Sequence, residues 1–242
     1  MISVCMATYN GEKYIEAQLR SILSQLSEND EVIVSDDAST DRTLEVVRQL
    51  NDDRIKIVHH ETDHGYTKNF ENALKYARGD YIFLSDQDDE WLPEKVNVTL
   101  SALKNADFVV SDCITQDENG NVLDPSRFKT FKIKKGFWRL MIKTRYLGCC
   151  MAFKKNVLQA ALPFPENSYY IEHDLWLAAV AELYFKVELI NQPLIIYKRH
   201  GNNTSDAGNG KGYPLSVKLK RRVYRLKCLR GIKGKIKKIK EQ

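Results

Sequence analysis

Short apolar runs alternate with longer amphipathic stretches through the first 112 residues. Runs typical of buried strands lie at 2–6, 31–35, 55–59, 81–85 and 107–112. Between them, apolar residues recur every three or four positions, which predicts helices at about 15–26, 39–50, 67–77 and 93–103. Strands that alternate with helices of this length indicate parallel βαβ units. We therefore expect an α/β fold with a doubly wound, mostly parallel sheet flanked by helices.

The pattern after residue 112 is less regular. It predicts helices at 136–144 and 171–183, and short strands at 122–123, 147–153, 186–190 and 194–197. A stretch rich in glycine, asparagine and serine at 202–212 predicts a flexible loop or linker. We therefore expect one domain over residues 1–204, followed by a linker and tail over residues 205–242.

The tail combines a strong positive charge with a helical repeat. From Lys211 onward it holds 13 Lys and Arg against one Glu, whereas the preceding 210 residues hold 24 basic and 31 acidic residues. Apolar residues at helical spacing predict an amphipathic helix with a basic opposite face (Leu215, Leu219, Val223, Leu226, Leu229, Ile232, Ile236 and Ile239). Gly231 and Gly234 weaken its helical propensity.

This pattern is typical of a helix that lies on an anionic membrane surface, which is the partner we expect for residues 213–242. A basic stripe also suits nucleic acid, but Tyr224 is the sole aromatic available for stacking in the tail helix, so we expect no nucleic-acid partner. Docking of the tail onto the acidic domain is the remaining alternative.

The composition narrows the class of protein. Apolar residues make up 43% of the chain, which excludes a disordered or fibrous protein. No run of about 18 apolar residues is present, so no transmembrane helix is expected, and the first residues show no signal-peptide pattern. The five cysteines have no CxxC spacing, which disfavours a zinc site or a disulfide framework and makes the cytoplasm the expected compartment.

Polar residues follow three of the predicted strands, where ligands of such sheets bind. These segments are Thr8-Tyr9-Asn10, Asp36-Asp37 and Asp86-Gln87-Asp88-Asp89. Three carboxylates within four residues repel one another, and Mg²⁺ or Mn²⁺ offsets that repulsion because both ions prefer hard oxygen ligands. A solvated acidic loop is the alternative interpretation. The histidines at 59, 60 and 64 show no recognisable ligand spacing, and we assign them no role.

Three ordered motifs carry a resemblance to a known family. They are Ser-Val-Cys-Met-Ala-Thr-Tyr-Asn-Gly at 3–11, Val-Ser-Asp-Asp-Ala-Ser-Thr-Asp at 34–41 and Phe-Leu-Ser-Asp-Gln-Asp-Asp-Glu-Trp at 83–91. Over about residues 1–204 the chain resembles the family-2 glycosyltransferases of the GT-A fold. Two further motifs, Glu172-His173-Asp174 and Tyr197-Lys198-Arg199-His200, are similar to those of bacterial rhamnosyltransferase-like members.

The resemblance implies a nucleotide-binding half over residues 1–112 and an acceptor-binding half over residues 113–204. In the first half, it assigns nucleotide contacts to Thr8, Tyr9, Asn10, Asp37 and Asp86. Of these, Asp37 would accept a hydrogen bond from a ring N–H of the base, and Asp86 would be shared between ribose and metal. Lys68 is a further candidate by position, because it lies where a predicted helix approaches the nucleotide, and it would lie near phosphate; a solvated side chain is the alternative.

The remaining assignments concern the metal and the acceptor. Asp88 would be the principal metal ligand, with His200 as a further metal contact and Arg199 at the diphosphate beside it. Asp174 matches the catalytic base of the family. The resemblance also places Glu172, His173 and Trp176 at the acceptor or diphosphate, although His173 departs from the commoner Glu and core packing is the alternative for Trp176.

The chemistry agrees with these assignments. A divalent cation neutralises the leaving diphosphate, and one carboxylate removes the proton of the acceptor hydroxyl, which implies inversion at the anomeric carbon. We expect an inverting, Mn²⁺- or Mg²⁺-dependent enzyme of bacterial surface polysaccharide synthesis, peripheral on the inner face of the plasma membrane. It would use a dTDP- or UDP-linked donor and a glycan or lipid-linked acceptor. Rhamnose is one candidate sugar; glucose, galactose and N-acetylhexosamine are others. The alternatives are a nucleotidyltransferase and a non-catalytic nucleotide-sugar-binding module.

Overall fold

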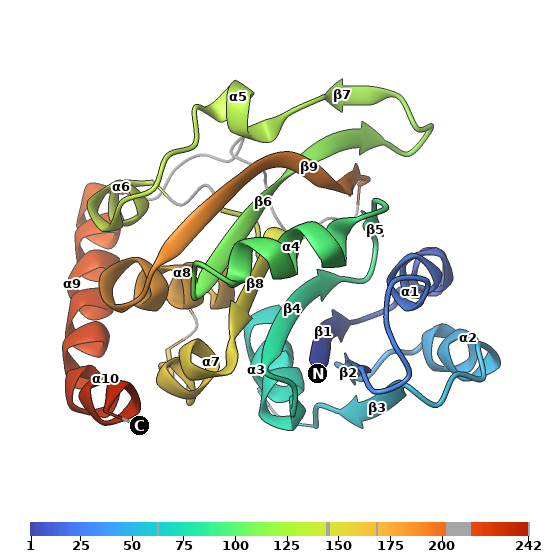
Figure 1. Ribbon diagram of the computed structural model, residues 1–242, viewed down its shortest axis with the longest axis horizontal. Helices are drawn as coiled ribbons and strands as arrows, with labels where there is room; N and C mark the ends of the chain where they lie inside the picture. The colour runs from blue at the N-terminus through green and yellow to red at the C-terminus, as the bar shows by residue number, and fades with distance from the viewer. Residues whose placement is uncertain (62, 144–145, 168, 202–213, 242) are drawn as a thin grey trace.

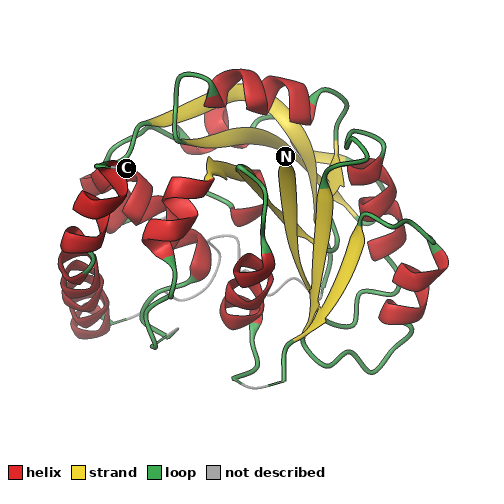
Figure 2. Ribbon diagram, turned by 60° about the horizontal axis from the view of Figure 1, so that its bottom comes forward, coloured by secondary structure: helices red, strands yellow, loops and turns green. Residues whose placement is uncertain are grey.

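Four parallel strands form the N-terminal part of the sheet. The computed structural model describes residues 1–61, 63–143, 146–167, 169–201 and 214–241. In it, these strands lie in the order β3–β2–β1–β4 (Ile55–His59, Glu31–Asp36, Ile2–Thr8 and Tyr81–Asp86). β1 and β2 are buried almost throughout, because helices cover both faces of the sheet (Figure 1, Figure 2). The predicted α/β architecture is confirmed.

A helix connects each pair of consecutive strands in this part. They are α1 (Ile15–Leu23), α2 (Thr43–Gln49) and α3 (Tyr66–Tyr76). Residues 39–41 were expected to supply the N-terminal cap of α2, and α2 begins at Thr43, whose backbone N–H donates to the Asp41 carboxylate at 2.9 Å. The other boundaries agree with the predicted ones to within a few residues, so this half of the pattern is confirmed.

The second half extends the sheet in mixed directions, which the sequence pattern did not indicate. β8 (Met151–Lys154) runs antiparallel between β4 and β6 (Phe108–Asp117), so β4 and β6 are not neighbours. β6 pairs in parallel with β9 (Val187–Arg199), which is one strand where two short strands were predicted. β5 (Glu90–Trp91) pairs with β9, and β7 (Val122–Asp124) pairs with β6. The β5–β9 pair brings the end of β9 close to the segment that follows β4.

Helices from both halves of the chain pack against α8 (His173–Tyr184), which is buried from His173 to Ala181 apart from Asp174. Its residues are apolar around most of its circumference, as expected of a helix enclosed by others. α4 (Lys95–Leu103) and α6 (Phe137–Ile142) lie where helices were predicted. α5 (Arg127–Phe131), α7 (Lys155–Ala161) and the 3₁₀ helix Gly148–Cys150 were not predicted, because each is too short to show a helical repeat.

The tail forms two helices, α9 (Leu215–Gly231) and α10 (Lys233–Lys240), that pack beside α6, α7 and α8 (Figure 1). The prediction of one helix with a single apolar face is therefore wrong. The helix breaks beside Gly231, a poor helix former. Leu229 and Ile236 are buried against the domain, whereas the apolar residues earlier in α9 are exposed (Leu215, Leu219, Val223 and Leu226). Among the described helices, none has the length and apolar content needed to cross a bilayer.

Candidate functional site

The three polar segments predicted at strand ends meet at one edge of the sheet. In the register of the parallel strands, Thr8 lies beside Asp36, and Ala7 lies beside Asp86. The segments that follow β1, β2 and β4 are therefore neighbours although they are up to 80 residues apart in sequence. The fold therefore brings together the three polar segments that were predicted separately from the sequence.

Gln87 joins the ends of β1 and β4. Its side-chain Oε1 accepts hydrogen bonds from the Thr8 hydroxyl and from the backbone N–H of Tyr9 (2.9 Å), and its Nε2 donates to the Tyr9 carbonyl (3.0 Å). Thr8 is buried and its hydroxyl is directed to Gln87, so the structure does not support a base contact by the Thr8 side chain. Tyr9 is exposed at the edge. No role was predicted for Gln87, because acidic neighbours dominate its motif.

Asn10 connects the β1 loop to the loop that follows β2. Its side-chain Oδ1 accepts a hydrogen bond from the Thr40 backbone N–H at 2.8 Å, and its own N–H donates to the Ser39 hydroxyl at 2.9 Å. Its φ of 48° lies in the left-handed region, which asparagine tolerates better than most residues. The side-chain carbonyl is thus used within the protein, and a nucleotide contact by Asn10 stays a prediction.

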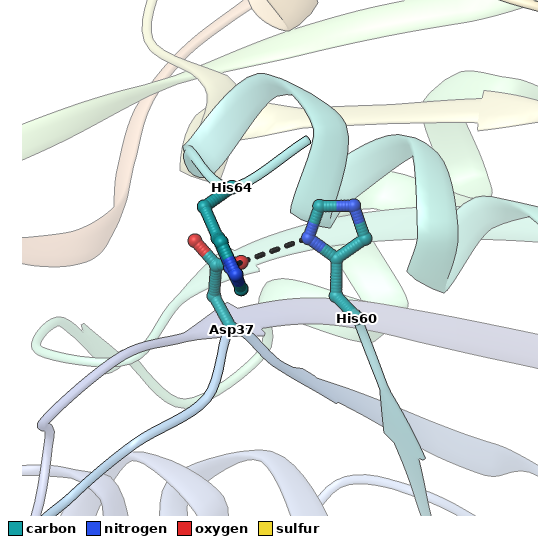
Figure 3. A group of neighbouring side chains, drawn as sticks. All are labelled: Asp37, His60 and His64. Carbon is teal, nitrogen blue, oxygen red and sulfur yellow. Dashed lines mark hydrogen bonds and ion pairs between the residues drawn. The ribbon is translucent and has the colours of Figure 1, made fainter. Parts of the chain in front are cut away.

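Asp37 is held by two histidines that the sequence interpretation passed over (Figure 3). The Nδ1 atoms of His60 and His64 each lie 2.8 Å from its Oδ1, and the Gly65 backbone N–H donates to its Oδ2 at 2.8 Å. Burial raises the pKa of Asp37, but the hydrogen bonds from His64, His60 and Gly65 outweigh it and hold that pKa below its usual value. The ionised carboxylate is therefore the favoured form.

A positional signal for these histidines exists in the sequence. His60 follows the end of β3, and His64 immediately precedes the glycine before α3, so both lie at the edge where Asp37 follows β2. One Asp and two His ligand atoms within 4.8 Å of one another also match a set that can hold a metal ion. A spacing rule within one segment misses such a set, because the fold assembles it from two strand ends.

The acidic segment at the end of β4 is partly buried, which makes ionisation of its carboxyl groups less favourable. Burial, together with the charges of Asp88 and Asp174, raises the pKa of Asp86 to about 8. The pKa of Asp89, which is almost fully buried, is raised well above its usual value, first by burial and then by Asp86 and Asp88. Carboxylates in this state gain most from a bound divalent cation, so the residues present fit Mg²⁺ or Mn²⁺.

His200 lies against this segment, and its role as a further metal ligand stays a prediction. Its Nε2 atom is 2.7 Å from Oδ2 of Asp88, and its ring stacks on Tyr14 with 4.7 Å between ring centroids. Arg199 is half-buried and lines, with His200 and Asp117, an open depression of about 400 Å³. A diphosphate contact by Arg199 stays a prediction.

Asp174 lies in the first turn of α8 and is half-buried. Burial, and then the charge of Glu172, raises its pKa to about 7, although the Leu175 backbone N–H and Arg225 oppose that rise. The charge of Asp174 contributes in turn to the raised pKa of Asp86, so the base candidate and the acidic segment share one electrostatic environment. A carboxyl group with a pKa near 7 suits proton transfer at neutral pH.

His173 is enclosed rather than presented to a ligand. Its ring stacks on Phe70 with centroids 4.1 Å apart, and neither ring nitrogen has a hydrogen-bond partner. Burial lowers its pKa to about 3, so it is neutral. Gly148 leaves room for the ring: a Cβ atom at that position would lie 2.7 Å from Nε2 of His173. An acceptor or diphosphate contact by His173 is therefore not supported.

Two further assignments are corrected by the structure. Trp176 is buried in the core and donates its indole N–H to the Ala161 carbonyl at 2.8 Å, so it is a packing residue and not an acceptor contact. Lys68 forms an ion pair with Glu71 at 2.9 Å, so its ammonium group is already engaged within α3. Glu172 forms an ion pair with Arg221 of the tail.

The sequence matches known proteins over most of its length. A family model described as glycosyl transferase family 2 matches residues 3–162. The chain is 28% identical over 214 residues to the UDP-Glc:alpha-D-GlcNAc-diphosphoundecaprenol beta-1,3-glucosyltransferase WfgD of Escherichia coli, covering 86% of this chain and 80% of that protein. It is 29% identical over 215 residues to the dTDP-rhamnosyl transferase RfbG of Shigella flexneri, covering 82% and 72%.

Solved structures share the fold. TarS 1-349 of S. aureus in complex with UDP-GlcNAc matches with a TM-score of 0.71 at 21% identity, covering 93% of this chain and 66% of that one. The mannosyltransferase PcManGT from Pyrobaculum calidifontis, in complex with GDP-Man and Mn²⁺, matches with a TM-score of 0.63 at 19% identity, covering 98% and 73%. At these identities the likeness concerns architecture alone.

Proposed function

Because the chain belongs to glycosyltransferase family 2, we propose that it is an inverting, metal-dependent enzyme that moves a sugar from a nucleoside-diphosphate donor to a hydroxyl group of an acceptor. One observation carries this proposal. Asp88 and His200, 2.7 Å apart, lie beside Asp86, and Asp86 shares an electrostatic environment with Asp174. A candidate cation site and a candidate base therefore border the same edge of the sheet.

Asp88, Asp86 and His200 would hold Mn²⁺ or Mg²⁺, which neutralises the charge of the leaving diphosphate. Asp174 would accept the proton of the acceptor hydroxyl as its oxygen bonds to the anomeric carbon. The bond from that carbon to the diphosphate oxygen breaks in the same step, and the nucleoside diphosphate leaves. With one base opposite the leaving group, the configuration of the anomeric carbon inverts.

Asp37 and Tyr9 would bind the nucleotide. Asp37 is ionised and lies at the carboxyl edge beside Tyr9, so it can accept a hydrogen bond from a ring N–H of uracil or thymine. The named donors of WfgD and RfbG, UDP-Glc and a dTDP-linked rhamnosyl group, carry these two bases. UDP-glucose and dTDP-rhamnose are therefore the first donors to test, and a lipid-linked glycan of bacterial polysaccharide synthesis is the proposed acceptor.

The tail and α6 would place the enzyme on a membrane. Six apolar side chains are exposed on these two helices, a set we call the α6–α9 face (Trp138, Ile142, Leu215, Leu219, Val223 and Leu226). The Arg222 guanidinium donates to the carbonyls of Met141 and Ile142, which holds α9 against the end of α6. Lys220, Lys227 and Arg230 of α9 are exposed as well, and each basic residue near an anionic surface contributes about 1 kcal/mol to binding.

A donor screen followed by a transfer assay tests the function. We expect one of dTDP-rhamnose or UDP-glucose to raise the melting temperature in the presence of Mn²⁺ or Mg²⁺ and not in EDTA. Asp174→Asn should keep that donor binding and lose transfer to the acceptor. Unchanged transfer by Asp174→Asn, or metal-independent transfer by the wild type, would contradict the proposal.

A further inference from the structure

Two arginines of α9 are buried side by side. Arg221 and Arg225 are one helical turn apart, and both are more than nine-tenths buried. Removing a guanidinium from water is unfavourable unless specific acceptors replace its hydration, and two adjacent cations also repel each other. The surroundings of these two side chains must therefore supply acceptors.

Three hydrogen bonds from these guanidinium groups end in one short segment just before the candidate base. Arg221 donates from Nη2 to Oε1 of Glu172 at 3.0 Å and from Nε to the Tyr170 carbonyl at 3.4 Å. Arg225 donates from Nε to the same Tyr170 carbonyl at 3.0 Å. Glu172 is the N-cap residue of α8, and Asp174 is in its first turn. The inner face of α9 is thus fastened to the backbone that leads into Asp174.

Electrostatics links the same groups. Burial, and then Arg221, lowers the pKa of Arg225 to about 10, whereas the charges of Glu172 and Asp174 act in the opposite direction. Arg225 in turn opposes the burial-induced rise in the pKa of Asp174. The guanidinium is close enough to Asp174 for each to affect the ionisation of the other.

The opposite side of the segment is fixed by the domain core. His173 stacks on Phe70 and meets Tyr66 edge-on at 5.8 Å between centroids, and Gly148 allows this close approach. The stretch from Tyr170 to Asp174 is therefore held between α3 on one side and α9 on the other. Such fixation matters because a misplacement of about 1 Å can lower a rate roughly 100-fold.

We propose that Arg221 and Arg225 are positioning residues for the base Asp174, so that α9 is part of the catalytic apparatus. This inference rests on the proposed function, since it takes Asp174 to be the base. α9 then has two roles on two faces: the inner face holds the segment before Asp174, and the outer face contributes to the α6–α9 face.

The test compares three arginines of the same helix. Arg221→Leu and Arg225→Leu are expected to lower kcat for transfer to a soluble acceptor about 10- to 100-fold, with the donor Kd in Mn²⁺ within about twofold of wild type. Arg225→Lys should recover part of the loss, because an ammonium group can still donate to the Tyr170 carbonyl. Arg222→Leu is the matched control, since the Arg222 guanidinium bonds the carbonyls of Met141 and Ile142 at the end of α6. Its kcat should stay within about twofold of wild type.

Each outcome decides the matter. An equal loss of kcat in Arg222→Leu and Arg225→Leu would show that α9 merely stabilises the domain and would overturn the inference, as would unchanged kcat in Arg225→Leu. If Arg225→Leu fails to fold, Glu172→Ala replaces it: this variant removes the partner of Arg221 from a half-exposed site, and a wild-type kcat would overturn the inference. If Asp174→Asn itself keeps transfer activity, the proposed function fails first.

Discussion

Nε2 of His200 lies 2.7 Å from Oδ2 of Asp88, although the two residues are 112 positions apart. The pairing of β5 with β9 produces this contact, because Glu90 lies opposite Ile196 and β9 ends one residue before His200. The two halves of the domain therefore contribute to one candidate cation site. Neither half contains the complete site by itself.

Loss of either side chain of this pair should weaken metal binding. We expect Asp88→Ala to lower kcat about 100-fold or more, and His200→Ala to lower it less and to raise the Mn²⁺ concentration needed for half-maximal rate, because each removes one ligand. Titration of transfer activity with Mn²⁺ measures both effects. Glu45→Ala, which removes an exposed carboxylate from α2, is the control and should match wild type.

Asp174→Asn should alter the pH dependence of stability. In the folded, metal-free protein the pKa of Asp174 is raised to about 7, above its value of about 3.9 in an unfolded chain. The folded state therefore binds this proton more tightly, and the stability it contributes below pH 4 is lost as pH rises toward 7. In urea unfolding with EDTA present, the free energy of unfolding of Asp174→Asn should therefore rise relative to that of wild type across that interval. At pH 8 this relative increase should amount to roughly 2 to 4 kcal/mol. A constant difference between pH 4 and pH 8 would contradict the raised pKa.

Gly148→Ala should disturb the segment that carries the base. The added Cβ would lie 2.7 Å from Nε2 of His173, whose ring is enclosed and cannot swing away freely. We expect a loss of about 1 to 3 kcal/mol of stability and a lower kcat. Gly231→Ala is the control: nothing lies within 4 Å of its Cβ position in α9, so this change should be neutral or stabilise by up to about 1 kcal/mol.

His60→Ala and His64→Ala should each weaken donor binding, because each removes a hydrogen bond that orients the Asp37 carboxylate. One such bond is worth about 1 kcal/mol, which predicts a rise in donor Kd of about fivefold by calorimetry. His59→Ala is the matched control, since His59 is exposed and outside the group of Figure 3. Equal donor Kd values for all three variants and wild type would contradict the assignment of Asp37 to the nucleotide site.

Charges placed on the α6–α9 face should prevent binding to anionic vesicles. Leu219→Glu with Val223→Glu replaces two exposed apolar side chains and adds two negative charges, so flotation with phosphatidylglycerol vesicles should be lost. Leu123→Glu, on exposed β7 and far from α9 in Figure 1, should float like wild type. These substitutions are preferable to deleting the tail, because deletion would also remove the buried Leu229 and Ile236.

Much of the fold follows from the sequence because its first half is regular. Buried parallel strands read as continuous apolar runs, and β4, for example, was predicted at 81–85 and lies at Tyr81–Asp86. The insertion of β8 between β4 and β6 could not be predicted, since pairing order in a mixed sheet depends on contacts between distant segments. α5 and α7 were missed because five and seven residues are too few to show a period.

The candidate site was predictable where residues follow strands and not where the fold assembles them. Asp37, Asp88, Asp174 and His200 carry recognisable motifs, and the structure places each at the expected edge or beside it. His60, His64 and Gln87 act through side-chain contacts with residues elsewhere, which no local pattern records. Lys68 and Trp176 were misassigned because sequence gives no burial or ion-pair partner for a single side chain.

The amide of Gln87 occupies the space next to Gly11. Any side chain at position 11 would overlap that amide, and the same amide ties Thr8 and Tyr9 to the acidic segment. Positions 11 and 87 therefore form a matched pair. Among relatives that keep this loop geometry, a residue larger than glycine at position 11 should occur together with a shorter side chain at position 87. The two positions should covary even though neither is expected to touch the sugar.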